Sequence, residues 1–407
     1  LPELGWIFSI AIFVLGASAA VFGRWVEDGG PRRAMFTAAL CWAGGFFLSA
    51  FGVSIHNLWV VYLGYGVLGG CGLGIGYISP VSTLIKWFPD RPGMATGMAI
   101  MGFGGGAFIA SPLSVWLMST FHTQHQIGIA PTFIALGAIY FVFMMVGAFI
   151  VRVPAPGWKP AGYVAPAKPS KLITTQDVYV YDALKTPQFW LIWWVLCLNV
   201  TAGIGVLGQA SAMSQEMFPG HITPVAAAGF VGLMSLFNMG GRFFWASTSD
   251  YIGRKATYFV FMVLGFGLYC TVPYTGQIGS VVGFVCCFLV IISMYGGGFS
   301  TVPAYLKDMF GTRYVGAIHG LLITAWSMAG IFGPVLVNYI REYNVTHGVP
   351  KAQAYNVTMY IMAGLLVIGF LCNLRVRAVN QRFHMRPEQG AVRRPVVGEA
   401  ARRPAEA

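Results

Sequence analysis

The sequence predicts an all-α polytopic membrane protein, and three observations support this fold class. Of the 407 residues, 57% are hydrophobic and only 9% are charged, whereas a soluble domain has roughly 25% charged residues. The apolar residues gather in runs long enough for a helix that crosses a bilayer, which takes about 20 residues. The basic residues collect in loops on one side of these runs. The predicted helices are 6–25, 34–54, 58–84, 93–118, 131–151, 189–213, 226–248, 256–275, 278–303, 315–340 and 356–376.

The basic residues predict how the chain is oriented. If the loops alternate between the two sides of the membrane, one side holds 22 of the 25 Lys and Arg residues. By the positive-inside rule this side is cytoplasmic. Its segments are 23–33, 86–91, 152–185, 254–255, 307–313 and the tail from 375. Because the charges are scattered over short loops, the net charge of +12 indicates topology and contact with anionic lipid headgroups, and not nucleic-acid binding.

Two pairs of matching motifs indicate an internal repeat. The turns "GRWVEDGGPR" and "ASTSDYIGRK" share an acid-x-x-Gly pattern followed by basic residues, and their acids, Glu27 and Asp250, are 223 positions apart. The segments "WFPDRPG" and "MFGTRYVG" share Phe-x-x-Arg, and their arginines, Arg91 and Arg313, are 222 positions apart. Two independent pairs at nearly the same offset predict a parallel repeat of two helical halves.

The repeat also predicts the domain boundaries. The first membrane half is 1–151, and 152–187 is a polar cytoplasmic linker with six prolines. The second half is 188–376, and 377–407 is a basic tail, most simply disordered and lipid-facing. Since the offset maps Leu1 near Thr223, the helix at 189–213 has no counterpart upstream. We therefore expect eleven helices of a twelve-helix bundle, with the first helix absent. All seven cysteines lie in the apolar runs and predict packed thiols without disulfides.

This duplicated bundle, with an acid-x-x-Gly-Pro-Arg turn after its second helix, resembles the major facilitator superfamily. Within that superfamily, "KWFPDRPGMATG", "KTPQFWLIW", "LFNMGGRFFWASTSDYIGR" and "IFGP" resemble the oxalate/formate antiporter family and the related monocarboxylate transporters. The resemblance implies two six-helix halves that rock about a central site. It also implies secondary transport of small organic anions, without a cofactor.

Arg242 is the main candidate for substrate binding. It lies eight residues before Asp250, so roughly 12 Å inside its helix, which is farther than snorkelling to the headgroups comfortably covers. A buried arginine costs about 2.5–3.5 kcal/mol and by default marks a polar pathway. The resemblance implies that Arg242 binds the substrate carboxylate, which its planar fork matches. Asn238, one turn away on the same face, adds a neutral hydrogen bond, with simple packing as the alternative.

The resemblance also implies that aromatic side chains line the cavity. They are Tyr77, Phe103, Tyr295 and Phe299. Lipid contact or core packing is the alternative for each of them. Asn199, in the helix that pairs with the absent one, is a further candidate. The glycine runs "GYGVLGGCGLGIGY" and "GFGGGAF" indicate close helix packing, because small residues let backbones approach.

Trp326 departs from the family pattern. The resemblance implies that oxalate carriers have a lysine at this position of the predicted helix 315–340, where "LLITAWSMAGIFG" has tryptophan. A dianion would then face Arg242 alone and stay half unpaired, whereas a monoanion would be neutralised one to one. We therefore expect a small monocarboxylate such as lactate, pyruvate or formate. The alternative is oxalate/formate-type dicarboxylate antiport.

The acids suggest how transport is coupled. No Asp or Glu lies inside the predicted helices, so the sequence offers no carboxylate as a proton site, unless His221 or His319 near helix ends serves. A cavity that holds Arg242 without an anion resists closure, because closure desolvates the charge. This favours exchange with a counter-anion or co-movement with a proton.

Six charged residues are predicted to latch the cytoplasmic ends together: Glu27, Arg32, Arg91, Asp250, Arg254 and Arg313. The pseudo-two-fold axis of the repeat brings Glu27 near the start of the predicted helix 315–340, around Arg313, and Asp250 near the start of the predicted helix 93–118, around Arg91. Each acid gains there from the partial positive charge of a helix N-terminus. Such contacts would stabilise the outward-facing state. The alternative is a pair of solvated surface contacts worth under about 1 kcal/mol.

Three other functional classes fit the sequence less well. A membrane enzyme needs a nucleophile or a metal set, and no His/Cys/Asp cluster at ligand spacing is present. A channel needs a continuous polar pore, for which the helices have too few polar residues. A transporter of cations or drugs needs an acidic cavity, which the sequence lacks.

Overall fold

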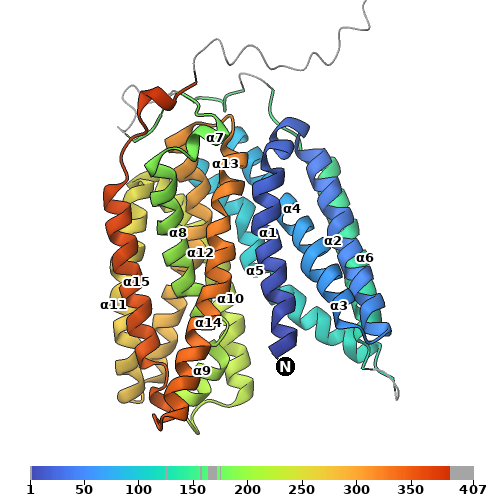
Figure 1. Cartoon of the computed structure of the whole chain (residues 1–407), viewed down its shortest axis with the longest axis vertical. Coiled ribbons are helices and arrows are strands. Elements are labelled where there is room, and N and C mark those ends of the chain that lie inside the picture. Colours follow the sequence, from blue (N-terminus) through green and yellow to red (C-terminus); the bar gives the residue numbers. More distant parts are fainter. Residues whose placement is uncertain (1, 124–126, 156–157, 164–171, 175, 386–407) are drawn as a thin grey trace, which may run out of the picture.

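The computed structural model describes residues 2–123, 127–155, 158–163, 172–174 and 176–385. In this part of the chain, eleven helical segments are long and apolar enough to cross a membrane, five before the linker and six after it. The prediction of an all-α polytopic membrane protein is confirmed. Figure 1 shows helices α1–α6 standing beside α8–α15, with the linker and the C-terminal segment at the same end of the bundle.

The first half consists of α1 (Pro2–Gly29), α2 (Pro31–Ser54), α3 (Leu58–Val61), the π-helix η1 (Tyr62–Gly69), α4 (Gly70–Trp87), α5 (Pro92–Thr120) and α6 (Ile129–Ile150). The linker contains α7 (Val180–Ala183). The second half consists of α8 (Pro187–Leu207), α9 (Ala210–Met217), α10 (Pro224–Ile252), α11 (Arg254–Gln277), α12 (Val281–Phe310), α13 (Val315–Leu322), α14 (Thr324–Thr346), η2 (Lys351–Gln353) and α15 (Asn356–Arg375), followed by η3 (Gln381–Phe383).

The helix boundaries correct two predictions. The predicted helix 189–213 ends at Leu207, and the chain continues as the separate helix α9. The predicted helix 315–340 is interrupted at Ile323, where the Trp326 N–H bonds to the Ile323 carbonyl three residues back, at 2.8 Å. A bond of this type tightens the helix by one residue and divides it into α13 and α14.

The helices also extend further than the hydrophobic runs. On the side of the linker, four acids that lie outside the predicted helices are in the last turns of the observed long helices: Glu27, Asp28, Asp250 and Asp308. The backbone bonding of a helix does not stop where the apolar residues stop, because charged residues are tolerated in a turn that reaches the membrane surface. These helix ends form what we call the basic side, the side of the linker and of the basic loops.

Glycines let the helices approach closely, as the two glycine runs predict. A Cβ atom on Gly74 would lie 2.3 Å from the Leu15 carbonyl oxygen, and one on Gly104 would lie 3.1 Å from the Met239 backbone nitrogen. The second contact joins α5 to α10, so it holds the two halves together beside Arg242. Close packing of small residues is a usual means of helix association in membranes.

The linker is partly docked on the second half. The Thr174 N–H donates to the Asp308 carbonyl at 2.8 Å, and the Val178 N–H donates to the Phe310 carbonyl at 2.9 Å. Val178 is fully buried and forms a β-bridge with His384. The segment that was predicted to be extended therefore covers the basic end of α12. The Arg-rich tail from 386 lies outside the described residues.

On the side opposite the basic side, one ion pair ties three helices together. The guanidinium of Arg341 on α14 donates to Glu216 on α9, with Nε 2.9 Å from Oε2. The Tyr355 hydroxyl, next to α15, donates to the same oxygen at 2.9 Å. Burial raises the pKa of Glu216, but the hydrogen bonds from Arg341 and Tyr355 outweigh this effect and leave the pKa below its usual value.

We expect Glu216→Gln to lower stability by about 1 kcal/mol at pH 7, because the ion pair is only partly screened from solvent. The folded-state pKa of Glu216 is lowered, so its contribution is present above the unfolded pKa and is lost as pH falls through the folded value. Thermal unfolding in detergent checks this: the difference between parent and variant should shrink below about pH 4. Asp182→Asn, which removes an exposed pair with Lys185, is the control and should change little.

Candidate functional site around Arg242

Arg242 lies in the middle of α10 and is only 2% exposed. Its Nε donates to Asn238 Oδ1 at 3.1 Å, and its Nη1 donates to the Ile100 carbonyl on α5 at 3.4 Å. No carboxylate among the described residues lies within ion-pair distance of Arg242. A buried guanidinium with five N–H donors and two neutral acceptors therefore retains both charge and hydrogen-bonding capacity for a ligand.

Packing between α10 and α12 fixes the position of Arg242. The Ser300 hydroxyl on α12 donates to the Arg242 carbonyl at 2.7 Å. Opposite Asn238, α12 has Gly296, where a Cβ atom would come within 2.5 Å of the Asn238 carbonyl oxygen. On the other side of Ser300, Thr96 of α5 donates to the Ser300 carbonyl at 2.6 Å. The arginine therefore lies where both halves meet.

Aromatic rings enclose the guanidinium. Its Cζ lies 5.7 Å from the centre of the Phe103 ring and 5.4 Å from that of Phe299, at cation–π distance. Trp326 packs on both rings, with centroids 5.4 Å from Phe103 and 4.6 Å from Phe299. Tyr77 contacts Phe103, Phe299 and Trp326. We call these four side chains (Tyr77, Phe103, Phe299 and Trp326) the aromatic cage.

Several donors in and beside the cage lack an acceptor. The Tyr77 hydroxyl and the Trp326 Nε1 are buried without a hydrogen-bond partner among the described residues. The Trp326 nitrogen lies near the Tyr295 hydroxyl without meeting hydrogen-bond geometry. Buried polar groups are normally paired, and each unpaired one costs about 1–3 kcal/mol. Unpaired donors around a positive charge suit a ligand that only accepts, such as a carboxylate.

Asn199 and Tyr295 lie farther from the centre of the cage. Tyr295 contacts Phe299, with ring centroids 6.1 Å apart. Asn199 on α8 lines a narrow cavity of about 10 Å³ with Tyr295 and Tyr269, and its Nδ2 has no partner among the described residues. The structure gives no contact between Asn199 and Arg242. Seven of the eight sequence candidates are thus linked by contacts around the guanidinium, and Asn199 adjoins them through the cavity that it shares with Tyr295.

Towards the basic side, Asp250 and Arg254, eight and twelve residues after Arg242, join the halves. The Asp250 carboxylate accepts the backbone N–H of Gly93 at 2.9 Å and that of Met94 at 2.8 Å, at the start of α5. Arg254 on the second half is 2.6 Å from Asp250 and 3.2 Å from Asp308. The cation beside Asp250 is therefore Arg254. The expected neighbour Arg91 has its Nε 4.0 Å from Asp90 instead.

The repeat produces a matching contact at Glu27. Its carboxylate accepts the Gly316 N–H at the start of α13 at 2.9 Å, and Lys86 lies 2.6 Å away. Arg32, which was expected beside Glu27, donates to the Phe149 carbonyl at 2.7 Å. The Arg313 N–H donates to Asp177 of the linker at 3.1 Å, and its guanidinium lies over Tyr314. We call the Glu27–Gly316 and Asp250–Gly93 contacts the two latches.

We expect Asp250→Asn to weaken the second latch and to shift the resting population towards the state that is open on the basic side. The variant loses the ion pair with Arg254 and weakens two charge-assisted hydrogen bonds to α5, each worth about 1.5–3 kcal/mol. Labelling of Ser82→Cys, a buried position facing Gly316, with a maleimide added from the basic side should become several-fold faster.

Asp28→Asn is the matched control for this experiment, because Asp28 is largely exposed and its ion pair is with Arg24, one turn earlier on the same helix. It should label like the parent. Equal labelling and equal transport in parent and Asp250→Asn would show that the latches do not bias the population.

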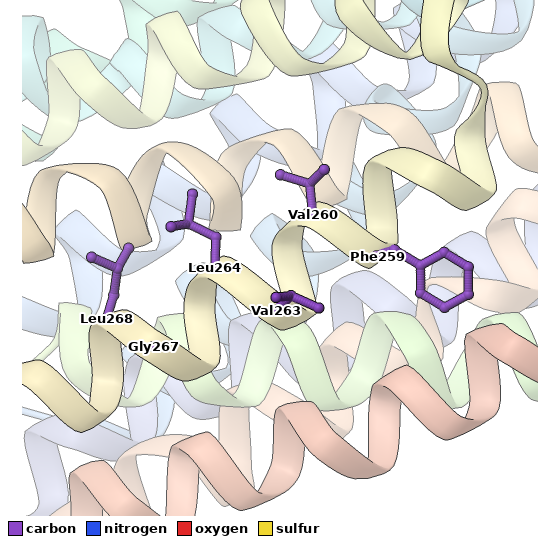
Figure 2. A pocket seen from close by; sticks show the side chains of 6 residues that line it. All are labelled: Phe259, Val260, Val263, Leu264, Gly267 and Leu268. Carbon is purple, nitrogen blue, oxygen red and sulfur yellow. The ribbon is translucent and has the colours of Figure 1, made fainter.

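A separate hollow on α11 is unrelated to this site. Figure 2 shows its lining, which comes from α11 alone and consists of Phe259, Val260, Val263, Leu264, Gly267 and Leu268. Its volume is about 550 Å³, and its walls are apolar. Val263 is 61% exposed on a membrane-spanning helix. An apolar, one-sided hollow of this kind fits contact with lipid chains and offers no group for recognising a polar ligand.

Comparisons with known proteins identify the family and the fold of this chain. Residues 1–334 match the sequence family described as Major Facilitator Superfamily. The Oxalate:formate antiporter of Oxalobacter formigenes is 29% identical over 327 residues, which are 80% of this chain and 73% of that protein. Monocarboxylate transporter 11 of Homo sapiens is 25% identical over 350 residues, which are 84% of this chain and 69% of that protein. The crystal structure of the transporter FucP in the outward conformation has a TM-score of 0.68 at 13% identity, covers 93% of this chain and 90% of its own, and is similar in fold.

Proposed function

Because the chain belongs to the Major Facilitator Superfamily, we propose that it is a secondary active transporter of small organic anions, and that Arg242 binds the substrate carboxylate. The observation that carries this proposal is the buried guanidinium, which has no carboxylate partner among the described residues and lies between unpaired donors. A carboxylate supplies both the charge and the acceptors that this site lacks.

Monocarboxylates are the preferred substrates. Four aromatic rings form the walls of the cage around Arg242. One of them is Trp326, which occupies the position where a second cation would be needed to favour a dianion. A monocarboxylate such as lactate, pyruvate or formate neutralises Arg242 one to one. A dianion would keep one charge unpaired in a poorly hydrated site, which is costly. The alternative is dicarboxylate exchange, as the name of the antiporter from Oxalobacter formigenes suggests for that protein.

Transport would proceed by alternating access. The two halves rock about the cage, and the latches hold the basic side closed while the opposite side opens. Closing an unoccupied site desolvates Arg242, so the loaded site closes more readily. This favours anion exchange or co-movement with a proton. By the positive-inside rule, the basic side, the linker and the C-terminus are placed in the cytoplasm, with the chain in the cell membrane.

Uptake into proteoliposomes tests the proposal. Purified protein is reconstituted and loaded with unlabelled formate, and the uptake of labelled formate is compared with that of labelled oxalate. We expect saturable formate uptake that is faster than oxalate uptake. If proteoliposomes take up both anions no faster than protein-free liposomes do, anion transport is contradicted. A strong preference for oxalate would favour the alternative.

A further inference from the structure

His319 is a titratable side chain beside the cage that the proposed mechanism does not yet use. It lies on α13, is fully buried, and neither ring nitrogen has a hydrogen-bond partner among the described residues. Its ring centre lies 5.5 Å from that of Tyr77, at an interplanar angle of 49°. A core histidine normally has at least one of its nitrogens hydrogen-bonded, so this environment needs an explanation.

The position of His319 connects the cage to the basic side. His319 and Trp326 both contact Tyr77, so they share one face of the α13–α14 segment. They are seven residues apart, about 10 Å along the helix axis. His319 is on the side of the latches, since the Gly316 N–H three residues earlier bonds to Glu27. An anion released towards the basic side would therefore pass His319.

Among the described residues, no Asp or Glu forms an ion pair with His319. Tyr77 is the titratable group for which the structure gives a ring contact with His319, and the Tyr77 hydroxyl also lacks a partner. Glu27 of α1, which accepts the Gly316 N–H three residues before His319, is also paired with Lys86 of α4. In the described part of the chain, the other titratable groups on the elements packed against α13 are Arg24 and Asp28 on α1, Cys71 on α4, Cys286, Cys287, Tyr295, Tyr305, Lys307 and Asp308 on α12, Tyr181 and Asp182 on α7, and Tyr339, Arg341, Glu342 and Tyr343 on α14.

We propose that His319 is the proton site of the transporter and takes up a proton when a carboxylate binds at Arg242. This inference rests on the proposed function. A proton from water adds to one unpaired ring nitrogen, and the neutral imidazole becomes an imidazolium. When the site opens to the other side and the anion leaves, the same N–H bond breaks and the proton returns to water.

The coupling between anion binding and proton uptake follows from the charges present in the empty and in the loaded site. In the empty site a second positive charge near Arg242 is unfavourable, so His319 stays neutral. A bound carboxylate attracts the imidazolium, and binding therefore raises the proton affinity of His319. By linkage, the proton raises the affinity for the anion by the same factor. A dianion attracts the imidazolium more strongly, so its binding should raise the proton affinity of His319 more than the binding of a monoanion does.

Binding measurements between pH 8 and pH 5.5 test this inference. Formate suits the purpose, because it stays ionised over this range. In the parent protein we expect the formate Kd to fall about tenfold towards pH 5.5, and in His319→Gln we expect a Kd that is constant within about twofold. His221→Gln is the matched control, because His221 is exposed in the loop between α9 and α10. It should keep the pH dependence of the parent.

A pH-sensitive dye in weakly buffered solution gives a second readout. Formate binding to the parent should remove protons from solution, and binding to His319→Gln should not. If the parent binds formate through Arg242 without proton uptake, or if His319→Gln keeps the pH dependence, the inference is overturned and the proposed function stands. If formate binding does not depend on Arg242, the proposed function is wrong and the inference falls with it. His319→Asn replaces His319→Gln if that variant does not fold.

Discussion

Arg242→Gln is expected to reduce carboxylate transport by about 30-fold or more while the protein still inserts and folds. The substitution removes the buried cation that lies between Phe103 and Phe299. Truncating one partner of a buried charge pair costs about 2–5 kcal/mol of binding, and 1.4 kcal/mol is a factor of ten. Folding should tolerate the change, because an unpaired buried charge costs desolvation free energy in the empty protein.

Arg242→Lys should fail almost as completely. The ammonium of lysine is a point charge without the planar fork of the guanidinium, and so cannot bind a carboxylate in the bidentate manner. It would also lose the bond from Nε to Asn238.

The measurement is initial uptake of labelled formate by proteoliposomes that contain equal amounts of folded protein, judged by size-exclusion chromatography. Arg32→Gln is the control, since it removes the same charge from an exposed side chain on the basic side. Transport at the parent rate by folded Arg242→Gln would exclude Arg242 from substrate binding.

The depth of Arg242 in the membrane can be predicted from the sequence, because depth along a straight helix depends on the number of residues from the helix end. The distance from Asp250 along a straight helix places the guanidinium far from the headgroups, and the structure shows it buried. The repeat predicts the placement of the acids for a similar reason. A pseudo-two-fold axis relates the ends of whole helices, so Glu27 and Asp250 meet the starts of α13 and α5.

The partners of these acids are harder to predict. Lys86 and Asp308 join the latch network through side-chain directions that depend on helix rotation and on the approach of neighbouring helices. Arg32 instead turns to the Phe149 carbonyl, which no sequence pattern indicates. Several charged residues can lie within one helical turn. Because successive side chains point about 100° apart around the helix, the rotation of the helix determines which of them reaches the acid.

The inward orientation of the cage side chains and the burial of His319 are also hard to predict from the sequence. Membrane helices are apolar on the lipid face and on the packed face alike, so periodicity does not reveal which aromatic side chains point inward. Tyr77 and Trp326 were found through family resemblance. The burial of His319 results from the approach of α1 and α4 to α13: at Gly320, one residue later, a Cβ atom would come within 2.2 Å of the Ala19 carbonyl oxygen. Such an approach is visible only in three dimensions.

Trp326→Lys is expected to change the preference between anions by about 10- to 100-fold in favour of dicarboxylates. The Trp326 ring contacts Phe103 and Phe299, the two rings that lie over Arg242. An ammonium at this position adds a second cation to the site. At an effective dielectric constant near 20, a close charge pair is worth about 4 kcal/mol before desolvation, and about half of this value gives the expected change. A dianion gains more from this added charge than a monoanion does, so the preference moves towards oxalate.

Competition of oxalate and formate against labelled formate measures the preference. Trp326→Met is the matched control, because it removes the indole ring and leaves similar space without adding charge. If Trp326→Met changes the preference as much as Trp326→Lys, the effect comes from the volume of the site. If neither variant changes it, the substrate does not contact Trp326. A change that appears only with lysine would show that the number of cations facing the cage decides between mono- and dicarboxylates, because a charge left unpaired in a poorly hydrated cavity is the largest cost that either anion meets there.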